Sequence, residues 1–224
     1  MKRFVTLNSL SIAFLVLFLA ALVGQGLAGW QALDDEQVAE GFGHVGLLDY
    51  LTSADFSVAV MENWQSEYLQ FLLYILATIW FLQVGSPESK KLDCAGLESD
   101  EDQKVGPHAA PDSPRWAGAG GWRTGLYSWS LPLVMGTVFL LSWLGQSIAG
   151  WATYNQQRLE QLRDPLTWGS YLVHADFWER TLQNWQSEFL AVGSMAVLSI
   201  YLRARGSAES KPVGTSHTST GVEG

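Results

Sequence analysis

Two glutamates stand at the start of long apolar segments and share one sequence motif. Glu67 and Glu188 each end the pentapeptide Asn-Trp-Gln-Ser-Glu, at residues 63–67 and 184–188. A carboxylate at membrane depth is costly and is a functional candidate by default, because it can take up a proton or a cation. The candidate polar cluster at the outer membrane interface comprises Gln25, Gln146, Asn63, Asn184, Glu67 and Glu188.

A structural role for the same glutamates is the competing hypothesis. A carboxylate in the first turn of a helix accepts hydrogen bonds from free backbone amides and complements the helix dipole. The sequence alone leaves both hypotheses open for Glu67 and Glu188.

Four tryptophans are expected to mark the outer interface of the membrane, where aromatic side chains gather. In each repeat we expect one tryptophan to end the first membrane helix and one to begin the second. These interfacial anchors are Trp30 and Trp151 at the helix ends, and Trp64 and Trp185 at the helix starts. At about 1.5 Å per residue, Gln25 and Glu67 lie at similar depth on neighbouring antiparallel helices. The spacing therefore predicts hydrogen bonds from Gln25 to Glu67 and from Gln146 to Glu188.

The elements that position these residues occur twice. Shifting the chain by about 121 positions aligns Gly-Gln-Gly-Leu-Ala-Gly-Trp at 24–30 with Gly-Gln-Ser-Ile-Ala-Gly-Trp at 145–151, and aligns the two Asn-Trp-Gln-Ser-Glu motifs without a gap. The same shift pairs Gly-Ser-Pro-Glu-Ser-Lys at 85–90 with Gly-Ser-Ala-Glu-Ser-Lys at 206–211. The chain therefore contains an internal duplication.

Long uncharged segments predict four transmembrane helices, at about 8–30, 64–84, 128–151 and 183–203. The fourth segment is long enough only if Glu188 lies inside the interface and Arg203 extends back to water. The first segment follows Lys2 and Arg3 as a signal peptide would, but its counterpart lies in the middle of the chain, so we expect it to stay in the mature protein.

The predicted fold class is an all-α membrane protein built from two parallel two-helix repeats, with a pseudo-two-fold axis along the membrane normal. The expected organisation is a first repeat at 1–84, a disordered cytoplasmic linker at 85–121, a second repeat at 122–205 and a disordered tail at 206–224. Lys and Arg residues occur before the first span, between the second and third spans and after the fourth span, whereas the segment 31–63 has none. The positive-inside rule therefore places both termini in the cytoplasm.

Several classes of function are disfavoured. The formal charge of -9 argues against nucleic acid as a partner, since such proteins present a basic face. No phosphate-binding loop, nucleophile elbow or Cys/His pair is present, so we expect no catalytic residue, no enzyme activity and no cofactor. The single Cys94 and the unmatched His44 and His174 have no second ligand at metal-binding spacing, so we expect no metal.

The doubled Gln-x-x-Ala-Gly-Trp and Asn-Trp-Gln-Ser-Glu motifs resemble those of an uncharacterised bacterial family with four predicted spans, a domain of unknown function. The resemblance covers nearly the whole chain apart from the linker and tail. It implies a multi-pass protein of the bacterial inner membrane and transfers no activity or site.

The leading hypothesis is a non-enzymatic packing or interaction protein of the lipid bilayer. It would act by self-association or through an envelope protein partner at its acidic outer face. The alternative is a small proton- or cation-coupled transporter that uses Glu67 and Glu188. The two hypotheses differ in whether these glutamates face a wet cleft or a packed helix contact.

Overall fold

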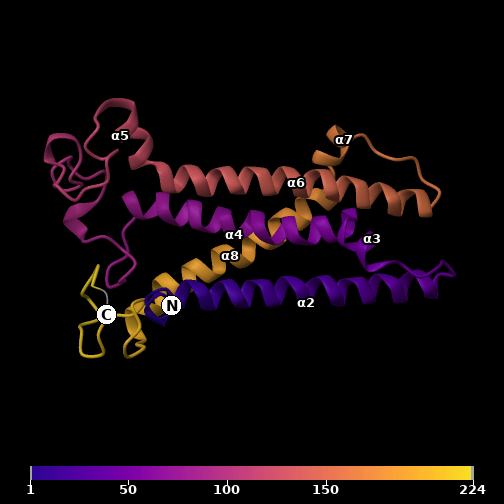
Figure 1. The fold of residues 1–224 in the computed structure, drawn as a ribbon, viewed down its shortest axis with the longest axis horizontal. Coiled ribbons are helices and arrows are strands. Elements are labelled where there is room, and N and C mark those ends of the chain that lie inside the picture. Colours follow the sequence, from indigo (N-terminus) through magenta and orange to yellow (C-terminus); the bar gives the residue numbers. More distant parts are fainter. Residues whose placement is uncertain (1, 223–224) are drawn as a thin grey trace. The chain divides into compact units, whose positions relative to one another are not determined.

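The computed structural model describes residues 2–222, which form helices and loops with no strand in that range (Figure 1). The first half contains α1 (Lys2–Leu7), α2 (Ser9–Ala39), α3 (Leu47–Leu51) and α4 (Ala54–Trp80). The second half contains α5 (Gly121–Ser128), α6 (Ser130–Glu160), α7 (Trp168–Leu172) and α8 (Ala175–Tyr201). Two single-turn 3₁₀ helices, η1 (Leu92–Cys94) and η2 (Gly106–His108), lie between the halves. The all-helical part of the predicted fold class is confirmed.

The duplication extends to the bounds of the helices. Helices α2 and α6 have 31 residues each, α3 and α7 have 5, and α4 and α8 have 27. Helices α6, α7 and α8 begin 121 residues after α2, α3 and α4, as Ser130 follows Ser9 and Ala175 follows Ala54. The two halves therefore share one secondary structure as well as their motifs.

The chain forms two compact units, and each takes residues from both sequence halves. The first unit comprises Met1–Met61 and Gly145–Tyr171, and the second comprises Glu62–Leu144 and Leu172–Gly224. The first unit thus holds α2, α3 and the later part of α6. The second holds α5, α8 and most of α4.

Helices α4 and α8 begin well before the points where the sequence placed the membrane spans. Because α4 begins at Ala54, Trp64 lies inside the helix, and the expectation that Trp64 and Trp185 begin helices is wrong. Glu67 likewise lies in the fourth turn, where backbone amides are already bonded within the helix. The first-turn role proposed for the glutamates is therefore wrong, and that position belongs to Asp55 in α4 and Asp176 in α8.

Among the described residues 2–222, two helices, α2 and α6, are long and apolar enough to cross a membrane by length and composition. Four were expected. The polar first halves of α4 and α8, which carry Glu62, Glu67, Arg180 and Glu188, lower the apolar character of these helices. Their ends at Trp80 and Tyr201 also precede the predicted ends at 84 and 203.

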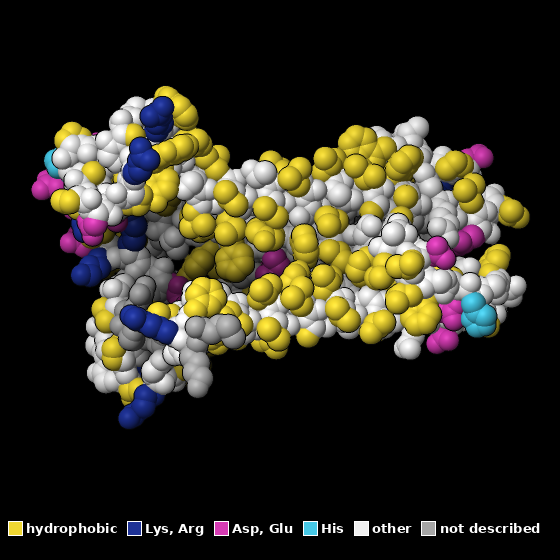
Figure 2. Space-filling model, in the orientation of Figure 1, with side chains coloured by type: hydrophobic (Ala, Val, Ile, Leu, Met, Phe, Trp, Pro, Cys, Tyr) yellow, Lys and Arg dark blue, Asp and Glu magenta, His cyan; other side chains and the backbone are white. Residues whose placement is uncertain are grey.

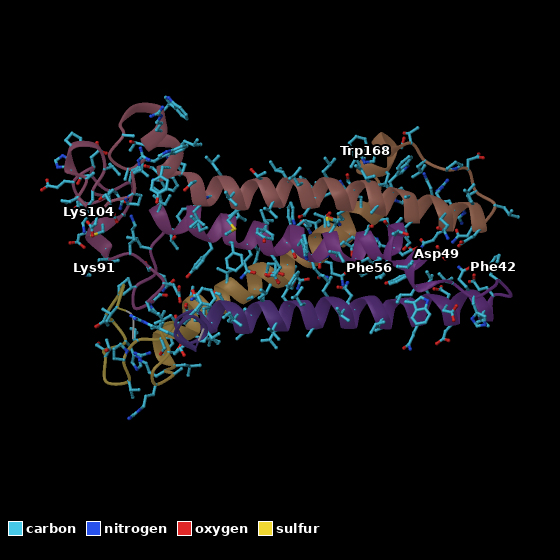
Figure 3. All side chains as sticks on the ribbon, in the orientation of Figure 1. Phe42, Asp49, Phe56, Lys91, Lys104 and Trp168 are labelled. Carbon is cyan, nitrogen blue, oxygen red and sulfur yellow. The ribbon has the colours of Figure 1, made fainter. Side chains whose placement is uncertain are left out.

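In the first unit, small residues of α2 and α6 let neighbouring side chains approach the helix backbone. Phe56, labelled in Figure 3, and Leu51 lie against Gly26 of α2. The buried Tyr50 lies against Gly29, and the buried Tyr171 lies against Gly150 in the same way. The glycines of the two Ala-Gly-Trp motifs therefore make room for tyrosines 21 residues further along the chain.

Substituting alanine for either glycine is expected to destabilise the protein. A Cβ atom at Gly29 would collide with the Tyr50 hydroxyl, and one at Gly150 would lie 2.6 Å from the Tyr171 hydroxyl. We expect Gly29→Ala and Gly150→Ala each to lower the free energy of unfolding by about 1–3 kcal/mol, the usual cost of overpacking. Thermal melting of the purified variants measures this effect.

The matched control is Gly24→Ala on α2, since a Cβ atom at Gly24 meets no atom within 4 Å. Replacing a helical glycine by alanine in open space favours the helix by up to about 1 kcal/mol. Equal melting temperatures for Gly24→Ala and Gly29→Ala would contradict the steric role of Gly29.

Candidate functional site

A pair of hydrogen bonds fastens the loop that follows α2 back onto that helix. The Trp30 indole Nε1 donates to the backbone oxygen of Val45 at 2.7 Å, and the Val45 amide donates to Asp34 Oδ1 at 2.7 Å. Trp30 and Asp34 lie one helical turn apart on the same face. Together they hold both backbone groups of Val45, and we call this arrangement the first clasp.

The second clasp is built from the equivalent residues of α6. Trp151 Nε1 donates to the Leu166 oxygen at 2.7 Å, and the Leu166 amide donates to Asn155 Oδ1 at 2.8 Å. Asn155 Nδ2 adds a bond to the same oxygen at 2.9 Å. The indole N–H groups of Trp30 and Trp151 thus have backbone partners.

The first clasp carries a charge pair that the second does not. His44 Nδ1 lies 2.9 Å from Asp34 Oδ2, whereas the position equivalent to His44 is Pro165. The hydrogen bond from His44 lowers the pKa of Asp34, and the Val45 amide lowers it further. In return, the hydrogen bond to Asp34 raises the pKa of His44 above its ordinary value of 6.5.

In the second unit, the two copies of Asn-Trp-Gln-Ser-Glu contact each other across α4 and α8. Trp185 Nε1 donates to Gln65 Oε1 at 2.7 Å, and Ser66 Oγ donates to Glu188 Oε1 at 3.4 Å. Gln65 and Ser66 are fully buried, and no hydrogen-bond partner is present for Gln65 Nε2. The duplicated motif therefore bonds to its own copy.

An aromatic cluster surrounds this contact. The Trp143 ring centroid lies 5.7 Å from that of Trp185, 6.0 Å from that of Phe177 and 5.6 Å from that of Phe139. Trp143 Nε1 also donates to the buried Thr181 Oγ1 at 3.4 Å. Aromatic pairs at these distances add about 0.5–1.5 kcal/mol each beyond their buried area, so the cluster fixes the Trp185 indole opposite Gln65.

Charged side chains join the same two helices beside the motif contact. Arg180 of α8 donates to Glu62 of α4 at 3.2 Å and to Asp176 at 3.2 Å. Sequence analysis missed Glu62 and Arg180, although one signal was present. Arg180 stands where the first repeat has Ala59, and a charge gained by one copy of a duplicated helix points to a new partner.

The structure brings together part of the predicted polar cluster. Glu67 is exposed and Glu188 half-buried, and Ser66, the residue before Glu67, donates to Glu188. Asn184 Nδ2 donates to the Arg180 oxygen within α8 at 2.8 Å, and Asn63 is exposed. Gln25 and the buried Gln146 belong to the first unit, so their hydrogen bonds to the glutamates stay predictions.

No group of three or more His, Cys, Asp or Glu side chains within residues 2–222 is placed to hold a metal ion. In the described motif contact, Trp185 donates to Gln65 and Ser66 donates to Glu188. Hydrogen bonding and packing between helices are what this arrangement supports best.

These features define an all-helical protein made from two copies of one helical unit, with a clasp in each copy and a contact between the copies of one motif. The chain belongs to the family described as domain of unknown function (DUF6766), which matches residues 1–222. The resemblance to an uncharacterised family is confirmed at that level. Searches of curated proteins and of solved structures found no match.

Asp34→Asn is expected to remove the charge pair with His44 and to keep the first clasp, because Asn155 forms the equivalent clasp in the second copy. The stabilising effect of a raised His44 pKa is complete below 6.5 and is lost as the pH rises through the raised value. The stabilising effect of the lowered Asp34 pKa is fully present above pH 3.8 and is lost as the pH falls through the lowered pKa. An NMR titration should show the His44 pKa returning toward 6.5 in Asp34→Asn.

Asn155→Asp is the control for this titration, since the second clasp has Pro165 where the first has His44. It should leave the His44 titration unchanged. The same His44 pKa in the wild type and in Asp34→Asn would contradict the pairing.

The Trp185 to Gln65 bond is testable by removing one partner and then both. Trp185→Phe keeps an aromatic ring beside Trp143 but leaves the buried Gln65 amide without its donor, at a cost of about 1–3 kcal/mol in unfolding free energy. Adding Gln65→Leu removes the unsatisfied amide and should recover much of this loss. A double variant whose destabilisation equals the sum of the two single variants would contradict the bond, as measured by thermal melting.

Proposed function

We propose that this chain is a non-enzymatic inner-membrane protein of bacteria, in which α2, α4, α6 and α8 cross the bilayer and which acts through association. The exposed surface of α2 supports the membrane location. Gly26 is its one buried residue, and large apolar side chains are exposed along its length (Figure 2). The exposed apolar residues include Leu10, Phe14, Leu15, Val16, Leu17, Phe18, Leu19, Val23 and Leu27.

Such a surface needs an apolar environment. Covering one Leu, Val or Phe side chain is worth about 1.5–3 kcal/mol, so an uncovered helix of this kind is unfavourable in water. Core helices of soluble proteins are also apolar, but they are mostly buried. Only 6% of the most apolar window of α2 and 22% of that of α6 are buried, which favours lipid as the covering phase.

The proposal includes α4 and α8 because their later halves are apolar and their ends carry suitable polar groups. The segment from Tyr68 to Trp80 has no charged side chain. At the end of α8, the Arg203 guanidinium donates to the oxygens of Ser199 and Ile200 at 3.2 and 3.0 Å. This arginine satisfies carbonyl groups that a helix end leaves free. The distribution of Lys and Arg supports a topology with both termini in the cytoplasm.

Association, rather than catalysis, is favoured by how the motif side chains are used. Trp30, Trp151, Trp185 and Gln65 all bond within the chain, so they serve its own packing. On the proposed topology, the end of α2 presents an acidic face to the outside, with Asp35, Glu36 and Glu40 exposed. We propose a second copy of the chain or an envelope protein as the partner of this face.

Transport is the second candidate, favoured because Glu188 of α8 accepts a hydrogen bond from Ser66, the residue before Glu67 in α4. A transporter would bind its proton or cation between these carboxylates. A packing protein would not respond to their neutralisation in a cation-dependent way.

The experiment has a location arm and a function arm. The full chain should stay in the membrane pellet after an alkaline wash, and crosslinking in native membranes should give a discrete species larger than 24.7 kDa. In lipid nanodiscs, the wild type and Glu67→Gln with Glu188→Gln should respond alike to pH and added cations in thermal melting. Glu36→Gln with Glu40→Gln is the matched control for the loss of two negative charges.

Each arm can contradict the proposal separately. Release of the chain by the alkaline wash would rule out the membrane location. Absence of any crosslinked species would rule out association. Stabilisation by one cation that disappears only in the Glu67→Gln, Glu188→Gln variant would support transport instead.

A further inference from the structure

The duplicated Gly-Ser-x-Glu-Ser-Lys sequence folds into the same turn twice, at 85–90 and at 206–211. Gly85 and Gly206 have φ values of +84° and +82°, a region that favours glycine. The Ser89 hydroxyl accepts from the Gln83 amide at 2.9 Å, and the Ser210 hydroxyl accepts from the Ala204 amide at 2.9 Å. We call these the first turn and the second turn, and both belong to the second unit.

The lysines that end the two turns have different surroundings. Lys90 of the first turn donates to the Gly96 oxygen at 3.1 Å and pairs with Glu98 at 2.9 Å. Lys211 of the second turn is fully buried, and its ammonium contacts backbone oxygens. These are the oxygens of Gly85 at 2.6 Å, Ser216 at 3.1 Å, His217 at 3.1 Å and Ser219 at 3.2 Å.

A buried ammonium is strongly unfavourable unless its N–H groups are bonded. Lys211 has three N–H donors and four oxygens around them, so the group is satisfied by carbonyl dipoles. Three of these oxygens come from the tail after Pro212 and one comes from the first turn. The Lys211 ammonium therefore joins two segments that are more than 100 residues apart in sequence.

Further bonds hold the tail against the first turn. The Gly85 amide donates to Thr220 Oγ1 at 2.9 Å, and the Gly221 amide donates to the Ser86 oxygen at 3.1 Å. The tail backbone comes so close that a Cβ atom at Gly85 would collide with the His217 oxygen. The tail thus occupies the polar groups of the first turn as a bound peptide would.

The end of the tail also lines a pocket of about 540 Å³ beside the first turn. Its other walls are the end of α4 and the loop that carries Lys91, which is labelled in Figure 3. The charged side chains in its lining are Glu88, Lys90, Lys91 and Glu98. Gly221 is the lining residue that the tail supplies, so the tail forms one part of the pocket wall.

We propose that Lys211 is a latch: its ammonium, caged by four carbonyl oxygens, holds the C-terminal tail over the first turn and closes one side of the adjacent pocket. Loss of the ammonium leaves the cage without a donor and releases residues 212–221. The pocket beside the first turn then loses the part of its wall that Gly221 supplies.

The test is amide hydrogen exchange on the full chain with Lys211→Met, which keeps the length of the side chain and removes its N–H groups. Hydrogen bonds from a charged donor are worth about 1.5–3 kcal/mol, so we expect the amides of Gly85 and Gly221 to exchange about tenfold faster or more. The matched control is Lys90→Met, which removes the equivalent lysine of the first turn and should leave Gly221 protected.

A second variant reaches the same state by another route. Gly85→Ala should displace the His217 backbone and release the tail while Lys211 is intact. Unchanged exchange within α8 in each variant shows that the fold is retained. Gly221 exchange at the wild-type rate in Lys211→Met, or equal acceleration in Lys90→Met, would overturn the proposal.

Discussion

The hydrogen bond from the Trp185 indole to the Gln65 amide is the contact on which the second unit depends. Gln65 is fully buried on α4, where an amide without a partner is costly, and Trp185 is the residue of α8 that satisfies its oxygen. The indole also packs against the rings of Phe139 and Trp143, whose centroids lie 6.4 and 5.7 Å from its own. This bond therefore sets the register of α4 against α8, and the Arg180 to Glu62 pair fits that register.

The two copies keep the residues that shape the backbone and differ in the residues that meet other segments. The clasps, the glycines opposite tyrosines and the serine-bonded turns recur at the same spacing. The differences lie where each copy has its own neighbours. Arg180 replaces Ala59, Trp178 replaces Ser57 and Thr181 replaces Val60, all on the part of α8 beside the aromatic cluster.

Sequence reasoning predicted the features that depend on local pattern. The helical class follows from long uncharged apolar segments, and the repeat follows from identity at one spacing. Trp64 and Trp185 were expected at helix starts because tryptophans gather at membrane interfaces, although helical spacing continues without a break from Ala54 through Trp64. The partner of Gln65 could not be predicted, since spacing along one helix does not give its register against another. The burial of Lys211 depends on oxygens supplied by a distant turn and by a tail of unstructured composition.

Each clasp fixes the base of its loop without involving the tip. Trp30 and Val45 are 15 residues apart, as are Trp151 and Leu166, and each pair is joined by the indole bond at the base of its loop. Once a loop is pinned at its base, extra residues at its tip add only the entropy of closing a longer flexible segment. That cost rises by about 0.6 kcal/mol for each doubling of length. The stretch between Glu40 and His44 is thus a place where an inserted epitope or a longer natural loop would leave the helices undisturbed.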